Sequence, residues 1–407
     1  MAVLSRRWSI VLALFVVTFG ISMPLAAFGV FFPIISATFG WSRGAIASAL
    51  SLSLVFGGVA GFFVGRLADR HGPRTMLIVT VGLAGVGYGL VSSISALWQL
   101  YVLVGVLGGT GMSSFYLLSA STVSHWFHDR RGLALALVLA GFNIGYMIAG
   151  PLAAWLIDQL GWRLAYAAIG FGCAIVSLLA ATTVRLPRAA ERVTARPVGA
   201  VTAASGVTLA RALRDPRFWM LNVSWLMLGG VIFTLSVHAV PFARDQGVSL
   251  ARASLALTAY GIGSVLGRVS SGLLADRIGA RPTMRAAYVV ELIALSILVT
   301  APAPSVLLVV MTLFGIGAAS TDNTLVKAIP DLFGLRAIGA IMGVFNLWWR
   351  AGAALGPATA GFVYDLTGSY AVPFAATPIA VMLSWVLFWL ATRGAAGVSR
   401  PPSGSAA

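Results

Sequence analysis

The sequence is built from long apolar stretches of about 20 residues or more, separated by short segments that contain Arg, Gly, Pro or Asp. A helix needs about 20 predominantly apolar residues to cross a bilayer, whereas a barrel strand is shorter and alternates apolar with polar residues. The sequence therefore predicts an all-α membrane protein with twelve transmembrane helices. The expected spans are residues 8–36, 43–64, 75–94, 97–124, 132–157, 164–184, 217–241, 250–272, 283–301, 304–328, 338–363 and 370–392.

The composition excludes several other classes of protein. Of the 407 residues, 59% are hydrophobic and only 9% are charged, against about 25% charged in an ordinary soluble domain. The net charge of +16 would suggest a nucleic-acid partner in a soluble chain, but the sequence offers no polar basic surface, so we expect none. The single cysteine, Cys173, rules out an intrachain disulfide and a cysteine-based metal site.

The sequence also lacks the signatures of an enzyme. It contains no Walker loop, no His/Glu metal motif on a helix and no triad in a plausible context. We therefore expect no catalytic residue, no metal and no cofactor. The apolar stretch from Trp8 to Ile35 is longer than the hydrophobic region of a signal peptide and is followed by another span, so we expect it to be the first transmembrane helix.

The cations are distributed unevenly between the two sets of loops. With the amino terminus placed in the cytoplasm, the cytoplasmic segments hold 21 Lys or Arg residues and the outer loops hold four. The four are Arg43, Arg163, Arg244 and Arg252. The positive-inside rule therefore predicts a multi-pass protein of the cell membrane with both termini in the cytoplasm. Two further cations, Arg268 and Arg350, fall inside expected spans.

The longest polar stretch, residues 185–216, contains six Arg and divides the chain in two. We expect four parts, namely an N-terminal six-helix half, a cytoplasmic linker, a C-terminal six-helix half and a disordered tail. Their limits are residues 1–186, 187–216, 217–393 and 394–407. Leu209–Arg214 is either a short amphipathic helix on the inner membrane surface or part of a loose tether.

The two halves share a repeat with an offset of 207 residues. The segments GRLADRHGPR at 65–74 and GLLADRIGAR at 272–281 are identical at seven of ten positions. Asp158 and Gly161 likewise recur as Asp365 and Gly368. Such repeats are typical of transporters whose substrate site lies between two related halves, near the bilayer midplane.

The two repeated segments resemble the cytoplasmic signature loops of the major facilitator superfamily, between helices 2 and 3 and between helices 8 and 9. The resemblance implies two pseudo-symmetric six-helix halves that work by alternating access. The aspartates can accept hydrogen bonds from the other half in only one state of the gate, and the glycines permit tight turns. The expected gating residues are Gly65, Asp69, Arg70, Gly72, Arg74, Gly272, Asp276, Arg277, Gly279 and Arg281.

Four further segments are more specific. They are FGVFFPIISATFGWSRGAIASALSL (28–52), HWFHDRRGLALALVLAGFNIG (125–145), GWRLAY (161–166) and ALRDPRFWML (212–221). Together they resemble bacterial members of the monocarboxylate porter and oxalate:formate antiporter branch, over the whole chain except linker and tail. This implies a secondary active transporter of small organic carboxylates in the bacterial inner membrane, working by proton-coupled symport or anion exchange. The alternative is a major facilitator exporter of larger amphipathic compounds, of the drug-efflux type.

The two cations inside spans are the main candidates for a substrate site. A mid-helix arginine is costly in lipid and therefore faces the bundle interior or a water-filled path. Its planar guanidinium matches a carboxylate with two parallel hydrogen bonds. In monocarboxylate porters, the resemblance assigns the substrate carboxylate to the position of Arg268. In the oxalate:formate antiporter it places a second cation, a lysine, near the position of Arg350.

The number of carboxylates on the substrate stays open. A dicarboxylate would satisfy both arginines, whereas a monocarboxylate would leave one to pair with the protein, for which Asp322 is the candidate. Asp322 is also the candidate for proton coupling, because a buried carboxyl beside an arginine can load and release a proton. Glu291 is expected on a peripheral helix. Animal relatives carry an Asp where this chain has Ser264, so their proton route does not transfer directly.

Aromatic and polar residues inside the spans are further candidates for lining the pocket of a small anion. We expect the partners to be a small organic anion, the lipid bilayer and, as a candidate coupling ion, the proton, with the monomer as the working unit. The pocket candidates are Phe28, Tyr116, Asn143, Tyr146, Asn346 and Trp349.

Overall fold

The computed structural model describes residues 2–113, 115–127, 130–187, 206–301, 303–334 and 336–393, and these ranges are nearly all helical. Apart from one isolated bridge between Gly206 and Gly334, they contain no β-structure. The expected tail at 394–407 and most of the expected linker lie outside the described residues.

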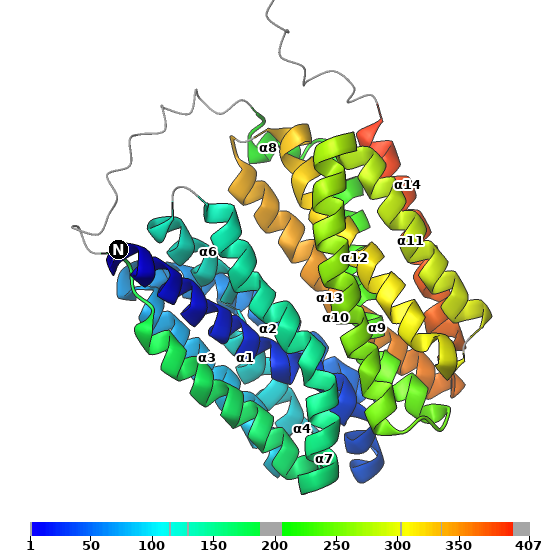
Figure 1. The fold of residues 1–407 in the computed structure, drawn as a ribbon. Coiled ribbons are helices and arrows are strands. Elements are labelled where there is room, and N and C mark those ends of the chain that lie inside the picture. The colour runs from blue at the N-terminus through cyan, green and yellow to red at the C-terminus, as the bar shows by residue number, and fades with distance from the viewer. Residues whose placement is uncertain are drawn as a thin grey trace, which may run out of the picture.

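The helices form two bundles that lie side by side in Figure 1. The first bundle contains α1 (Ala2–Phe39), α2 (Arg43–His71), α3 (Pro73–Gly89), η1 (Leu90–Ser93), α4 (Leu97–Leu100), η2 (Tyr101–Gly108), α5 (Gly109–Gly111), α6 (Phe115–Trp126) and α7 (Arg131–Thr183). The second contains α9 (Pro216–Asp245), α10 (Leu250–Ile278), α11 (Ala280–Thr300), α12 (Pro304–Phe333), α13 (Ile338–Thr367) and α14 (Ala371–Thr392). The fourth expected span is built from α4, a π-helical segment η2, α5 and α6.

Helix α7 contains two of the expected spans, 132–157 and 164–184. The chain turns between them at Gly161, whose φ of 74° and ψ of 160° are not helical. A left-handed φ costs a glycine nothing, because it has no Cβ to clash. Among the described residues, eleven helices are long and apolar enough to cross a membrane. Since α7 supplies two spans, this agrees with the twelve predicted.

The repeat seen in the sequence reappears as matched local geometry. Ser42 begins α2 by accepting a hydrogen bond from the backbone N–H of Ala45, and Ser249 begins α10 by accepting one from Arg252. Such caps satisfy amide groups that the first turn leaves without a partner. Glycines with positive φ also stand at matched positions. The pairs are Gly40 with Gly247, Gly72 with Gly279, and Gly161 with Gly368.

The molecule has two distinct ends. The Arg43 end is defined here as the end at which α2 begins, and the linker end as the end that carries α8 (Leu209–Ala212), at the top of Figure 1. The single-turn helix α8 is capped by Thr208 and precedes the start of α9. Just before it, the N–H of Val207 donates to the carbonyl of Phe333, so residues 206–212 are attached to the end of α12.

The bundles are joined mainly by contacts of α2 with α13, of α7 with α10 and of α1 with α9. Glycines let these pairs approach closely. A Cβ on Gly361 of α13 would lie 2.8 Å from backbone atoms of Arg43, and one on Gly150 of α7 would lie 2.5 Å from the carbonyl oxygen of Ser254. The backbones therefore meet directly, as small residues allow in membrane helix packing.

Candidate functional site

At the Arg43 end the bundles are joined by one arginine. The Arg43 guanidinium donates from Nη1 to Oδ2 of Asp245 at 2.8 Å and from Nη2 to Oδ1 at 2.6 Å. Nη1 also donates to the hydroxyl of Tyr370 at 2.8 Å, and the guanidinium carbon lies 3.9 Å from the ring centroid of Tyr364. A bidentate pair with an added cation–π contact is a strong form of ionic interaction. Arg43 therefore fastens α2 to the second bundle.

The same end contains a second inter-bundle contact, made by Asp365 on α13. Its Oδ1 accepts from the backbone N–H of Arg43 at 2.8 Å, and its Oδ2 accepts from that of Gly44 at 2.7 Å. These N–H groups belong to the first turn of α2, where the helix dipole favours a negative charge. Asp365 thus caps a helix of the opposite bundle.

His238 on α9 extends this network into the interior. It is fully buried, with Nδ1 2.9 Å from the Tyr370 hydroxyl and Nε2 2.9 Å from the carbonyl oxygen of Pro357. Because a carbonyl only accepts, Nε2 carries the hydrogen and Nδ1 accepts from Tyr370.

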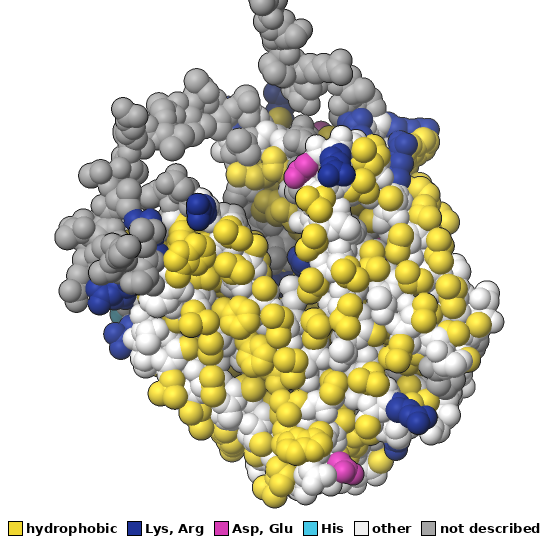
Figure 2. Space-filling model, in the orientation of Figure 1, with side chains coloured by type: hydrophobic (Ala, Val, Ile, Leu, Met, Phe, Trp, Pro, Cys, Tyr) yellow, Lys and Arg dark blue, Asp and Glu magenta, His cyan; other side chains and the backbone are white. Residues whose placement is uncertain are grey.

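The linker end differs from this closed end. Figure 2 shows the surface hollowed between the two bundles there, with Lys or Arg side chains inside the hollow. The side-chain hydrogen bonds that join the bundles lie nearer the Arg43 end, from Ser51 to the carbonyl of Ala354 and from Thr258 to that of Met147 at 2.6 Å. The structure is therefore closed at the Arg43 end and open at the linker end.

Arg350 lies on the face of α13 that meets α2. Its Nε donates to Oδ1 of Asn346 at 3.0 Å. A Cβ on Gly57 would lie 3.1 Å from its Nη1, and one on Gly58 would lie 3.4 Å from its Cδ, so this glycine pair leaves the room that the side chain occupies. In the part of the chain that the structure describes, no carboxylate lies within 4.0 Å of Arg350. Its charge is not neutralised by an ion pair there.

Arg268 on α10 has a different environment. Its Nη2 lies 3.5 Å from Oδ2 of Asp322 on α12, and the two side chains are 45% and 27% exposed. Asn323 donates to the hydroxyl of Ser271 at 3.0 Å and to the Arg268 carbonyl at 3.4 Å. Of the two arginines, Arg268 is therefore the one that pairs with Asp322. One contact of 3.5 Å leaves most of its five N–H donors for another group.

The other expected pocket residues are scattered. Phe28 is fully buried and its ring contacts that of Phe32, with centroids 6.1 Å apart. It is thus out of reach of a solute in this state. Tyr116 on α6 is 54% exposed. The structure brings Asn346 to Arg350 and Asp322 to Arg268, but it gives the two arginines separate sets of neighbours.

The remaining three expected residues pack with neighbouring rings or donate within their own helix. The Tyr146 ring lies between those of Phe142 and Tyr260, with centroids 6.2 and 5.9 Å away. Asn143 donates to the carbonyl of Leu139 at 3.4 Å. Trp349 packs on another aromatic ring, and its buried indole N–H has no acceptor.

The expected gating segments lie at the linker end, where α2 passes into α3 and α10 into α11. Gly72 and Gly279 make the two turns with φ of 81° and 91°. Their N–H groups donate to the carbonyls of Ala68 and Ala275 at 2.9 and 3.0 Å. The exposed Asp69 stands three residues before its turn, in a state in which this end is open. A hydrogen bond between Asp69 and the opposite bundle stays a prediction for the state in which the linker end is closed.

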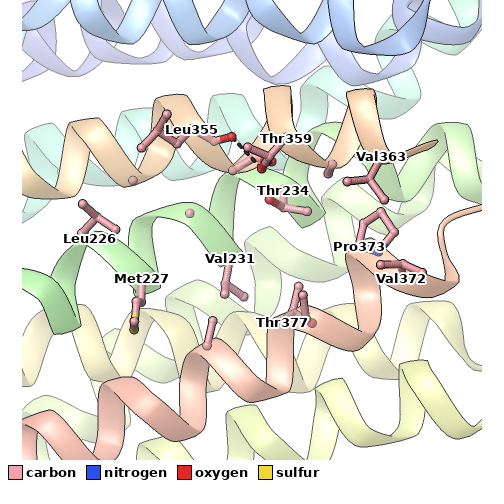
Figure 3. Close-up of a pocket in the computed structure, with 16 residues that line it drawn as sticks. Leu226, Met227, Val231, Thr234, Leu355, Thr359, Val363, Val372, Pro373 and Thr377 are labelled. Carbon is pink, nitrogen blue, oxygen red and sulfur yellow. Dashed lines mark hydrogen bonds between the residues drawn. The ribbon is translucent and has the colours of Figure 1, made fainter. Parts of the chain in front are cut away.

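A separate cavity of about 360 Å³ lies within the second bundle, between α9, α13 and α14 (Figure 3). Its wall is mostly apolar and includes Leu226, Val231, Thr234, Leu355 and Pro373. Since it contains no charged side chain, it does not suit a small anion. Across the described residues, no group of three or more His, Cys, Asp or Glu could hold a metal ion.

Sequence reasoning missed the closed end and the glycine pair of α2. Arg43 and Asp365 stand 322 positions apart, and Arg43 was counted only as an outer cation. The adjacent Gly57 and Gly58 were a usable signal, because paired glycines inside a span often mark close packing against another helix.

Comparison with known proteins gives a consistent result. The family model of the Major Facilitator Superfamily matches residues 10–250 and 236–406. Bovine monocarboxylate transporter 13 is 27% identical over 380 residues, covering 90% of this chain and 85% of its own length. The MFS-type transporter pytF of Aspergillus terreus is 30% identical over 281 residues, covering 67% of this chain and 90% of its own.

Among solved structures, a bacterial homolog of the human lysosomal transporter Spinster is similar in fold. That structure was determined in an inward-facing, unoccupied conformation. The TM-score is 0.76 at 18% sequence identity, with 95% of this chain and 97% of that chain covered. At this identity the likeness concerns the fold alone.

Proposed function

The chain belongs to the Major Facilitator Superfamily, as a multi-pass membrane transporter, and on that premise we propose that it carries small organic carboxylates by alternating access of its two bundles. Relatives named as monocarboxylate transporters support this substrate class. The alternative, an exporter of larger amphipathic compounds, has no comparable support, since we would expect it to have a wide cavity with acidic side chains.

The observation that carries the proposal is the charge of Arg350. It lies at the interface of the bundles, packed against Gly57 and Gly58, with no carboxylate within 4.0 Å among the described residues. A guanidinium in such a place is costly unless an anion neutralises it. In this proposal the substrate supplies that anion, as a carboxylate that accepts two parallel hydrogen bonds from Arg350.

Arg268 provides the second part of the site. A monocarboxylate at Arg350 would leave the Arg268–Asp322 pair intact, whereas the second group of a dicarboxylate would compete with Asp322 for Arg268. Tyr116, Asn143, Tyr146, Asn346, Trp349 and Phe28 would shape the pocket, with Phe28 contributing only after the Arg43 end opens.

The cation distribution supports a cytoplasmic position for the linker end, and we propose that both termini lie in the cytoplasm of a bacterial cell. The described structure is then the inward-open state. Closure of the linker end would bring Asp69 and Asp276 against the opposite bundle. The choice between proton symport and anion exchange depends on whether a residue couples transport to the proton.

The test is a thermal-shift screen of the purified protein against mono- and dicarboxylates. A ligand at about 100 times its Kd should stabilise the protein by about 2.7 kcal/mol. Arg350→Gln should abolish the shift for every carboxylate, and Arg268→Gln should reduce it chiefly for dicarboxylates. The control is Arg163→Gln, because Arg163 donates only to carbonyls of its own bundle. If no carboxylate stabilises the wild-type protein, the proposal is wrong.

A further inference from the structure

Glu291 is an acidic residue that the proposed site does not use. It lies on α11, is fully buried, and has no hydrogen-bond partner for either carboxylate oxygen among the residues that the structure describes. Buried polar groups are almost always hydrogen-bonded, and a buried unpaired charge is the most costly exception. The sequence pattern suggested only a peripheral position.

The surroundings of Glu291 contain hydroxyls and backbone but no cation among the described residues. On α12, a Cβ on Gly317 would lie 2.7 Å from the Glu291 Cβ, so the two helices touch there. Thr321 lies beside the carboxyl but donates its proton to the carbonyl of Ala318 at 2.9 Å. Among the described residues, the environment therefore offers an ionised carboxylate no counter-ion, and its burial removes it from solvent.

The neighbouring helices add no charge either. Tyr288 stands one turn before Glu291 on α11, and its hydroxyl lies 3.3 Å from that of Ser224 on α9 and 2.9 Å from that of Ser384 on α14. On α10, the mid-helix cation Arg268 pairs with Asp322. The carboxyl thus fits this packing in its neutral form.

We propose that Glu291 is the proton-binding site of this transporter, and that it acts on the substrate site through α12. The inference rests on the proposed function only for the identity of the cargo. Protonated, Glu291 permits the contact with Gly317 that the inward-open state shows. On losing the proton to water, the carboxylate must be solvated, which separates α11 from α12.

Helix α12 connects this event to the arginine pair. Asp322 follows Thr321 directly and stands five residues beyond Gly317, about 7.5 Å along the helix. Displacement of α12 at Gly317 therefore moves Asp322 relative to Arg268. Asp322 lies 3.5 Å from the guanidinium of Arg268, whereas no cation lies beside Glu291 among the described residues. This assigns the proton to Glu291 and the counter-charge to Asp322.

The experiment measures the pH dependence of the two states without any substrate. Nitroxide pairs across the linker end report the open fraction between about pH 6 and about pH 9 in wild type, Glu291→Gln and Asp322→Asn. Each pH unit above the titration point can change the ratio of states by up to tenfold. We expect the open fraction of the wild type to fall as pH rises, and that of Glu291→Gln to be independent of pH.

Asp322→Asn is the matched control, since it makes the same chemical change on the neighbouring helix. It should keep the pH response of the wild type. A wild-type response retained in Glu291→Gln, or lost only in Asp322→Asn, overturns the proposal. So does a wild type that shows no pH response. Because glutamine keeps the shape of the protonated side chain, an unchanged thermal midpoint confirms that Glu291→Gln is folded.

A transport assay then separates this inference from the proposed function. In liposomes, Glu291→Gln should keep exchange of labelled lactate for lactate within about twofold of wild type and lose accumulation driven by a pH gradient. Accumulation equal to that of the wild type contradicts the proton site. If the wild-type protein moves neither lactate nor a panel of other carboxylates while the pH response follows Glu291, the carboxylate proposal fails and the proton site stands.

Discussion

The contacts at the Arg43 end allow a direct test of what keeps this end of the molecule closed. Asp365→Asn removes the negative charge that caps α2 from the opposite bundle. The asparagine oxygen can still accept from one backbone N–H, but its amide group cannot accept from the other. The variant therefore loses one charge-assisted hydrogen bond of the two, at 2.8 and 2.7 Å, that join α13 to α2.

The magnitude follows from the geometry. A hydrogen bond to a charged group contributes about 1.5–3 kcal/mol, and we take the lower limit because Asp365 is solvent-exposed. These bonds bridge the bundles, so they exist only while the Arg43 end is closed. A loss of about 1.5 kcal/mol from one state alone changes the ratio of the two states roughly tenfold.

The assay is double electron–electron resonance between nitroxides at Trp98 on α4 and Val372 on α14, which are 63% and 56% exposed on opposite bundles. Replacing Cys173 with Ala removes the only native thiol of the chain. Asp365→Asn should transfer population from the short to the long distance, by roughly tenfold in their ratio.

The repeat supplies a matched control for this experiment. Asp158 is the counterpart of Asp365 at the same offset, but its carboxylate accepts only from the adjacent Gln159, at 3.1 Å. Asp158→Asn makes the same change of charge without touching the other bundle, so the distances should not change. An equal response of both variants, or none in Asp365→Asn, would refute the reasoning that Asp365 holds the state through its cap.

Three further predictions use other contacts. Gly361→Ala places a Cβ 2.8 Å from the Arg43 backbone and should open the Arg43 end in the same resonance assay, whereas Gly82→Ala, with nothing within 4 Å, should not. Asn346→Ala removes the acceptor of the Arg350 Nε and should change carboxylate affinity by about 1 kcal/mol, measured by titration calorimetry. Tyr288→Phe removes the hydroxyl shared with two serines and should destabilise the protein by about 1 kcal/mol in thermal unfolding, without altering ligand binding.

The parts of this fold that sequence could predict are those set by local composition. A span is recognised because its own 20 residues are apolar, and a turn such as Gly72 because its motif repeats at Gly279. The division of α7 near Gly161 was predicted in the same way, since the apolar spans 132–157 and 164–184 leave a gap that contains Gly161. These features need no knowledge of what lies across the interface.

The contacts that define the state could not be predicted in this way. Arg43 has no sequence feature that singles out Asp245 as its partner among the other acids, and the pairing exists only while the Arg43 end is closed. Phe28 illustrates the same limit, because an aromatic residue inside a span can line a cavity or pack between helices with equal chemical ease. Asp322 pairs with Arg268, which leaves Arg350 without a carboxylate partner among the described residues. Sequence alone could not predict which of the two arginines pairs with Asp322.

Binding and closure act on the same two helices, which gives a last prediction. On α13, Arg350 and Asp365 are 15 residues apart, about 22 Å, and on α2 their neighbours Gly57 and Arg43 are separated by a similar length. The effect of Asp365→Asn on the apparent Kd of an anion depends on which state the anion binds. One anion could bind Arg350 only in the state that is open at the linker end, and another could bind equally in both states. In the first case the apparent Kd rises as the inverse of the fraction that remains open at the linker end, and in the second it does not change. Calorimetry gives the carboxylate affinities of Asp365→Asn and Asp158→Asn. Their comparison shows whether the carboxylate prefers the state that is closed at the Arg43 end. An affinity that falls equally in both variants would show that the effect is electrostatic and not conformational.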